Sequence, residues 1–125
     1  MLTAANEKDW IATTAYYARY FAFYAVLQKY GIKSEIHDCT ISLMKLFVEE
    51  NIIEEHFYTE LLLAKDLRVD TQYYVGREID INKLKKDSET ARSFLLRMEK
   101  AIAETEKEQI SRIIEKIREE GFTAL

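Results

Sequence analysis

An arginine, two tyrosines and a histidine are the side chains best placed to do chemistry. Arg68 continues an apolar stripe at helical spacing, and Tyr73 and Tyr74 follow it within a few residues. Arginine binds phosphate through a planar fork of donors and keeps its charge near neutrality. If the chain is an enzyme, the predicted catalytic residues are Arg68 and Tyr73, although tyrosine titrates near pH ~10 and is a poor base near neutrality. The pattern favours ligand binding by Arg68, Tyr73 and Tyr74, with His37 as a further candidate.

Each of these residues also has a structural explanation. Arg68 could pair with a carboxylate such as Asp66, Asp70 or Glu60, or its guanidinium could stack on one of the two tyrosines. His37 follows a glycine turn and precedes an apolar segment, which suits a helix cap or a partly buried imidazole. For both residues, the structural role is the commoner one.

Other classes of chemistry have little support in the sequence. Cys39 is the single cysteine, and His37 and His56 lie too far apart for metal-ligand spacing, so we expect no metal and no cofactor. The net charge is −4, and the acidic excess falls in residues 34–66, opposite to a nucleic-acid footprint. A lone cysteine fits a reducing cytoplasm, and no secretory leader or membrane-length apolar run is present. We expect a soluble, cytoplasmic protein.

The elements that must position these residues are helices. The 125 residues contain no proline and 3 glycines, and 48% of them are hydrophobic, which predicts one all-helical domain over residues 1–125. We expect helices over about 8–30, 37–50 and 54–74, with Asn6 as an N-cap and Gly31 and Gly76 as stops. A long amphipathic helix should follow an N-cap at Asp80, complete a core at about 8–103, and precede a C-terminal helix at about 108–121. The predicted buried positions are Thr40, Leu43, Met44 and Phe47 in the second helix, Phe57, Leu61 and Ala64 in the third, and Leu84, Ala91, Leu95, Met98 and Ile102 in the long amphipathic helix.

The stretch AYYARYFAFY, residues 15–24, places six aromatic rings around one charge, Arg19. A helix that is apolar on every side needs cover on every side, and a small domain offers too few helices to provide it. Tyrosine also suits a partly wet interface better than a dry core. We therefore predict a homodimer interface that includes Tyr16, Tyr20, Phe23 and Tyr24, with plain core packing as the alternative.

This stretch, followed by Gly31, His37 and the apolar run 41–47, resembles the HEPN domain, in its branch of small archaeal and bacterial proteins with an Ala-Tyr-Tyr-Ala helix. The resemblance implies an antiparallel four- to five-helix up-and-down bundle that is commonly dimeric. Many HEPN proteins are metal-independent ribonucleases or toxins that pair with a small nucleotidyltransferase. Their catalytic arginine is followed closely by a histidine. Arg68 matches that arginine, but no histidine follows it, and Tyr73 or Tyr74 stands in that place.

We therefore interpret the chain as a non-catalytic or weakly catalytic HEPN-like module, which pairs with a nucleotidyltransferase or binds nucleotide or RNA phosphate. The alternatives are an active metal-independent endoribonuclease toxin that uses Arg68, and a purely structural dimeric adaptor. Relatives usually carry another helix before the Tyr-Tyr helix. We expect the isoleucine-rich tail, residues 110–117, to take that position in its own subunit or in its partner.

Overall fold

The described residues form five helices and contain no strand. The computed structural model describes residues 4–34, 37–73 and 81–120. The fold class is all-α, as the sequence predicts. None of the described helices combines the length and the hydropathy that a membrane crossing requires. The helices are α1 (Ala4–Lys29), α2 (His37–Glu49), α3 (Glu55–Tyr73), α4 (Ile81–Glu104) and α5 (Lys107–Glu120).

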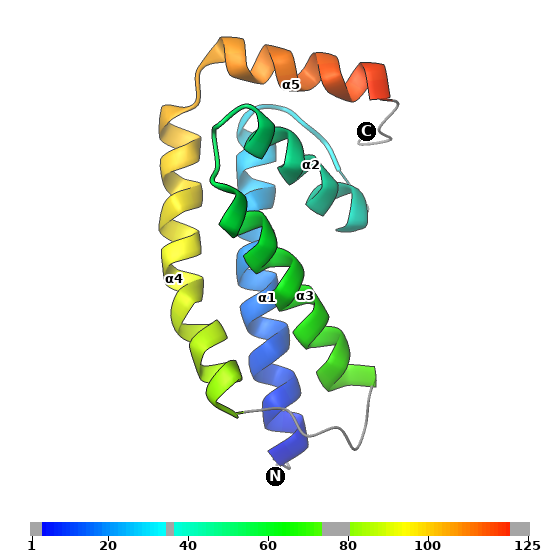
Figure 1. Ribbon diagram of the computed structural model, residues 1–125, viewed down its shortest axis with the longest axis vertical. Helices are drawn as coiled ribbons and strands as arrows, with labels where there is room; N and C mark the ends of the chain where they lie inside the picture. The colour runs from blue at the N-terminus through cyan, green and yellow to red at the C-terminus, as the bar shows by residue number, and fades with distance from the viewer. Residues whose placement is uncertain (1–3, 35–36, 74–80, 121–125) are drawn as a thin grey trace.

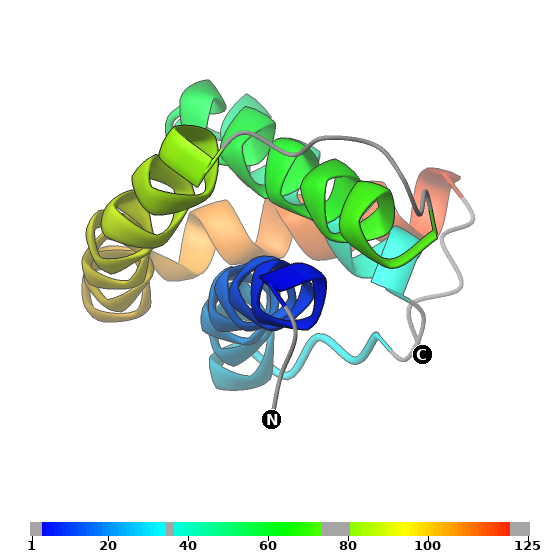
Figure 2. The ribbon, with the colours of Figure 1, turned by 90° about the horizontal axis from the view of Figure 1, so that it is seen from below.

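Three long helices, α1, α3 and α4, run along the length of the molecule, and α1 packs against both of the others. Figure 1 shows that α1 and α4 point in one direction and α3 in the opposite one. Seen from below in Figure 2, α1 lies beneath α3 and α4, which diverge above it. The short helix α2 packs against α3, and α5 crosses the end of the bundle. Helix α1 is therefore the central helix, in contact with both α3 and α4.

The core confirms the predicted faces of α2 and α3 and corrects that of α4. Every predicted core residue of α2 is buried, and so are Leu61 and Ala64 in α3. In α4, Phe94 and Met98 are fully buried, whereas the predicted Leu95 is 37% exposed. The buried face of α4 includes Phe94 because the Phe94 ring packs edge-on against the ring of Phe57 in α3, with the two centroids 5.7 Å apart.

Two helices end in left-handed turns. Gly31 has φ of 73°, and the backbone N–H of Ile32 donates to Leu27 at 2.9 Å, so the predicted glycine stop of α1 is confirmed. Asn51 plays the same part after α2 with φ of 60°, which the sequence analysis did not predict. Helix α1 begins at Ala4, so Asn6 lies inside the helix and the predicted N-cap was wrong. Gly76 and Asp80 lie outside the described residues.

The C-terminal helix docks on its own subunit. Ile110 and Ile113 of α5 are buried in the main core, and Arg112 pairs with Glu50 at the end of α2 at 2.5 Å. The predicted tail helix is therefore present and packed. It crosses the end of α2 rather than lying alongside α1 (Figure 1).

Candidate functional site

Arg68 lies in the seam between α3 and α1. It is half-buried, and its guanidinium carbon lies over the rings of Tyr16 and Tyr17, at 5.4 and 5.1 Å from their centroids. Such contacts attract a cation to the negative face of the ring. The sequence analysis expected stacking on tyrosines of the same segment, whereas these rings come from α1. Arg68 therefore links two helices while keeping its charge at a partly open position.

A second arginine, Arg19, is fully buried and joins three helices. From α1, its guanidinium donates to the Glu60 carboxylate of α3 at 2.7 Å. It also donates to the hydroxyl of Thr90 at 2.8 Å and the backbone carbonyl of Asp87 at 2.5 Å, both in α4. A fourth hydrogen bond reaches the carbonyl of Ala15 at 3.1 Å, and the Asp87 carboxylate lies 3.3 Å away. Each side of the guanidinium fork is thereby occupied.

The Arg19 cluster contains more negative than positive charge. Glu60 and Asp87 both face the one guanidinium, and their side chains are 22% and 14% exposed. Burial raises the pKa of Asp87; Arg19 opposes this rise, and the neighbouring Glu60 adds to it. The sequence analysis identified Arg19 only as the one charged residue within the aromatic run. A lone charge on an apolar helix is itself a signal that buried carboxylates must meet it.

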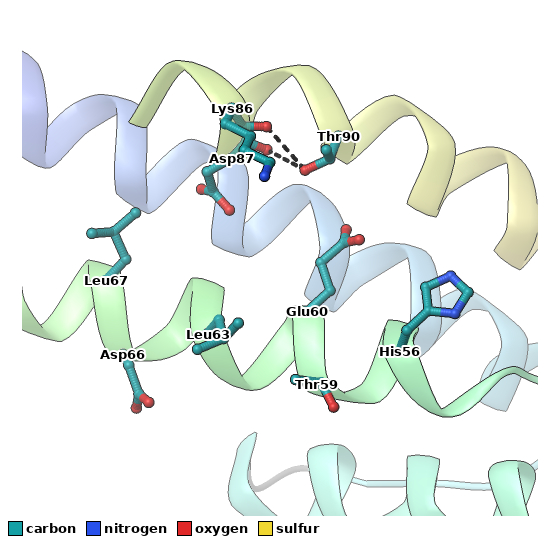
Figure 3. Close-up of a pocket in the computed structure, with 9 residues that line it drawn as sticks. All are labelled: His56, Thr59, Glu60, Leu63, Asp66, Leu67, Lys86, Asp87 and Thr90. Atoms are coloured by element: carbon teal, nitrogen blue, oxygen red, sulfur yellow. Dashed lines mark hydrogen bonds between the residues drawn. The ribbon is translucent and has the colours of Figure 1, made fainter. Parts of the chain in front are cut away.

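A groove of about 590 Å³ opens above this cluster, between α3 and α4 (Figure 3). Leu63 and Leu67 of α3 form apolar parts of its wall, and Leu63 is 60% exposed. Asp87 and Thr90 line the opposite side, so the groove reaches the residues that hold Arg19. The volume is in the range of small-molecule sites.

Comparison of the chain with known protein families identifies its family. A family profile described as the HEPN domain matches residues 2–119, nearly the whole chain. The chain belongs to the HEPN domain family. No match was found among curated proteins or among solved structures. HEPN domains as a class are associated with binding of nucleotides or RNA or with RNA cleavage, which makes a phosphate-binding cation the first group to seek.

The sequence analysis matched Arg68 to the HEPN catalytic arginine, and the structure describes less of the residues predicted to act beside it. Tyr73 is the last residue of α3 and His37 the first of α2, but their side chains lie outside what the structure describes. Tyr74 lies wholly outside the described residues. Glu60, one of the acidic partners considered for Arg68, instead pairs with Arg19. Of the predicted site residues, Arg68 is therefore the one whose surroundings the structure describes most fully, through its contacts with Tyr16 and Tyr17.

The aromatic helix divides between core and surface differently from the prediction. Tyr16, Tyr20 and Phe23 are buried within the subunit, where they pack with α2 and α3, and have no surface left for a second subunit. Tyr24 is half-buried, and Phe21 beside it is 57% exposed. The three buried rings are therefore explained by the core, and among the rings of residues 15–24 Phe21 is the most exposed.

Proposed function

We propose that this HEPN module binds the phosphate of a nucleotide or of RNA at Arg68 and cleaves RNA weakly or not at all. In this proposal it acts beside a small nucleotidyltransferase in a toxin–antitoxin-type pair. The observation that carries the proposal is the position of Arg68, a permanent cation on the aromatic faces of Tyr16 and Tyr17 in the seam between α1 and α3.

The contact with the rings supports binding in two ways. A guanidinium attracted to the face of a ring keeps its N–H donors in its own plane, which is the geometry in which it grips a phosphate. The rings also restrict the side chain before a ligand arrives, so less conformational entropy is lost on binding. Cleavage of RNA would also need a proton-transfer group that titrates near neutrality. No histidine follows Arg68 in the sequence to supply one, which is why we propose binding with little or no cleavage.

The test is binding of a fluorescent single-stranded RNA, and separately of ATP, by Arg68→Ala and Arg68→Lys. Loss of a charged hydrogen-bonding contact costs about 1.5–3 kcal/mol, which corresponds to roughly ten- to hundredfold weaker binding by Arg68→Ala. Arg68→Lys should retain part of the affinity, since it keeps the charge without the fork. For RNA, a plot of log affinity against log salt concentration should become less steep, with its slope smaller in magnitude by about 0.7 for one lost phosphate contact.

Arg92→Ala is the matched control because Arg92 is an exposed arginine of α4. It removes the same charge and should change binding by less than about threefold. Equal losses in the two alanine variants would show that binding follows net charge rather than Arg68. Unfolding curves for all variants separate a loss of binding from a loss of fold. An unchanged affinity in a folded Arg68→Ala protein would refute the proposal.

We also propose a homodimer that uses the outer face of α1 around Phe21. Two observations support it: Phe21 is largely exposed, and Tyr17, which stacks on it at 5.7 Å between ring centroids, is half-buried. Replacement of Phe21 by lysine should convert a dimer to a monomer in sedimentation without unfolding it, because the ring contributes little to the subunit core. A dimer of unchanged stability in this variant would place the interface elsewhere.

A reducing cytoplasm is the compartment that fits lone Cys39.

A further inference from the structure

The groove between α3 and α4 is separate from the Arg68 seam and has the opposite charge. Leu67 lines the groove, whereas the next residue, Arg68, faces the rings of α1. The partners of Arg19, namely Glu60, Asp87 and Thr90, line the groove together with Leu63 and Asp66. In Figure 3, Glu60 points from α3 toward α4, whereas Asp66 points away from α4. A ligand in this groove would meet leucine side chains flanked by carboxylates.

The charges around the groove do not cancel. Arg19 offsets only one of the two carboxylates that surround it. Asp66 adds another negative charge on the exposed wall, and Lys86 is the one lysine or arginine among the described lining residues. An anion such as phosphate is therefore disfavoured here, whereas a cation would reduce the repulsion between Glu60 and Asp87.

We propose that this groove binds a free aliphatic amine, of the diamine or polyamine class, with its methylene chain on Leu63 and Leu67 and its ammonium groups beside Glu60, Asp66 and Asp87. The wall supplies both halves of that chemistry, since apolar surface buries the methylenes and carboxylates accept from ammonium groups. Glu60 and Asp66 lie about 9 Å apart along the axis of α3 and about 120° apart around it, with Leu63 between them, so a ligand that meets both must curve over Leu63, as the flexible chain of a polyamine can.

The wall of the groove offers both kinds of surface that such an amine would contact. Leu63 presents most of its surface to solvent, so apolar area is available there for a methylene chain to cover. Asp87 Oδ2 is buried and accepts no hydrogen bond from the described residues. Because this oxygen is itself inaccessible, an ammonium group in the groove would meet the partly exposed remainder of the Asp87 side chain, where its attraction to the carboxylate acts through charge.

The experiment is a titration of the full chain with spermidine, followed by calorimetry and by the methyl resonances of Leu63 and Leu67. Saturable binding with shifts at both leucines is the expected result. Hexanediol is the control for the methylene chain without charge, and sodium chloride at matched ionic strength is the control for charge without a chain. Neither control should show saturable binding. Blocked lysine amide represents a basic side chain from a protein partner, and equal or tighter binding of that probe would overturn the assignment to a free amine.

Two pairs of variants locate the site. Leu63→Lys places a cation in the groove and should weaken spermidine binding about tenfold or more, whereas Leu96→Lys, at another exposed leucine, should leave it within about threefold. Asp66→Asn should weaken binding about two- to fivefold, and Glu89→Gln, an exposed carboxylate outside the groove, should not. Equal effects within either pair would mean nonspecific attraction to an acidic protein and would overturn the proposal. RNA binding at Arg68 is measured separately, so either proposal can fail alone.

Discussion

Replacement of Arg19 by methionine tests whether the buried cluster holds the bundle together. Methionine keeps much of the length of the side chain but removes the charge and every donor. Four hydrogen bonds and an ion pair to Asp87 are lost at a position with no solvent exposure. The carboxylates of Glu60 and Asp87 are then left together without a cation.

Removal of one partner from a buried ion pair costs about 3–5 kcal/mol, because the remaining charge is desolvated without compensation. Domains of this size unfold with about 5–15 kcal/mol, so the loss is a large part of the total. We expect the melting temperature to fall by roughly 10–20 °C. Arg19→Lys should lose less, since it keeps the charge but not the fork of donors.

The assay is urea unfolding followed by circular dichroism, with the exposed Arg92→Met as the control for loss of one positive charge. That control should change stability by less than about 0.5 kcal/mol. Adding Glu60→Gln and Asp87→Asn to Arg19→Met removes the stranded charges and should recover part of the loss. The reasoning fails if Arg19→Met costs no more than the control, or if the triple variant is no more stable than the single one.

The same substitution has a pH signature. A carboxyl whose pKa is raised in the folded state binds more protons folded than unfolded, so its stabilising contribution is complete below its ordinary value of 3.8 and is lost as pH rises through the raised value. Without Arg19 the upward shift of the Asp87 pKa should be larger. The deficit of Arg19→Met should therefore be smaller at about pH 5 than near neutrality.

Three further substitutions test other contacts. Arg112 holds the pKa of Glu50 below its ordinary range through a side-chain hydrogen bond, so that stabilisation is present above the ordinary glutamate range and is lost as pH falls through the lowered value. Arg112→Ala should cost about 0.2–1 kcal/mol near neutrality and nothing in acid, measured by hydrogen exchange of α5. Asn51→Ala should cost about 1–2 kcal/mol in thermal unfolding and Asn51→Gly much less, because φ is 60° there; equal costs would contradict this. Thr40→Val removes a buried hydroxyl that lies 2.6 Å from Ser34 and accepts from Tyr20 at 3.3 Å, and should cost about 1–3 kcal/mol in urea unfolding. Thr40→Ser, which keeps the hydroxyl, is its control and should cost less.

Much of the fold follows from periodicity that is visible in the sequence. The faces of α2 and α3 could be predicted because their apolar residues repeat at one helical spacing and are covered from one side. The same approach failed for α4, where Leu95 and Phe94 compete for the buried face. The position of the Phe57 ring, which is distant in sequence, decides in favour of Phe94.

The candidate site was predictable in part for the same reason. Arg68 could be found because it continues the stripe of Phe57, Leu61 and Ala64. Its contacts with Tyr16 and Tyr17 could not, because they depend on how α1 crosses α3. The groove could not be predicted from the sequence either, because it depends on how α3 and α4 diverge over α1 (Figure 2).

The central claim is that Arg68 binds phosphate in a module that has little or no ribonuclease activity. It is tested most directly by incubating purified protein with a mixed RNA pool in the presence of a chelator, beside Arg68→Ala matched for fold and oligomeric state. The account predicts intact RNA in both reactions, with RNA retained on the wild-type protein and lost from the variant. Efficient cleavage by the wild type that Arg68→Ala abolishes would contradict it and would identify an active nuclease without the usual histidine.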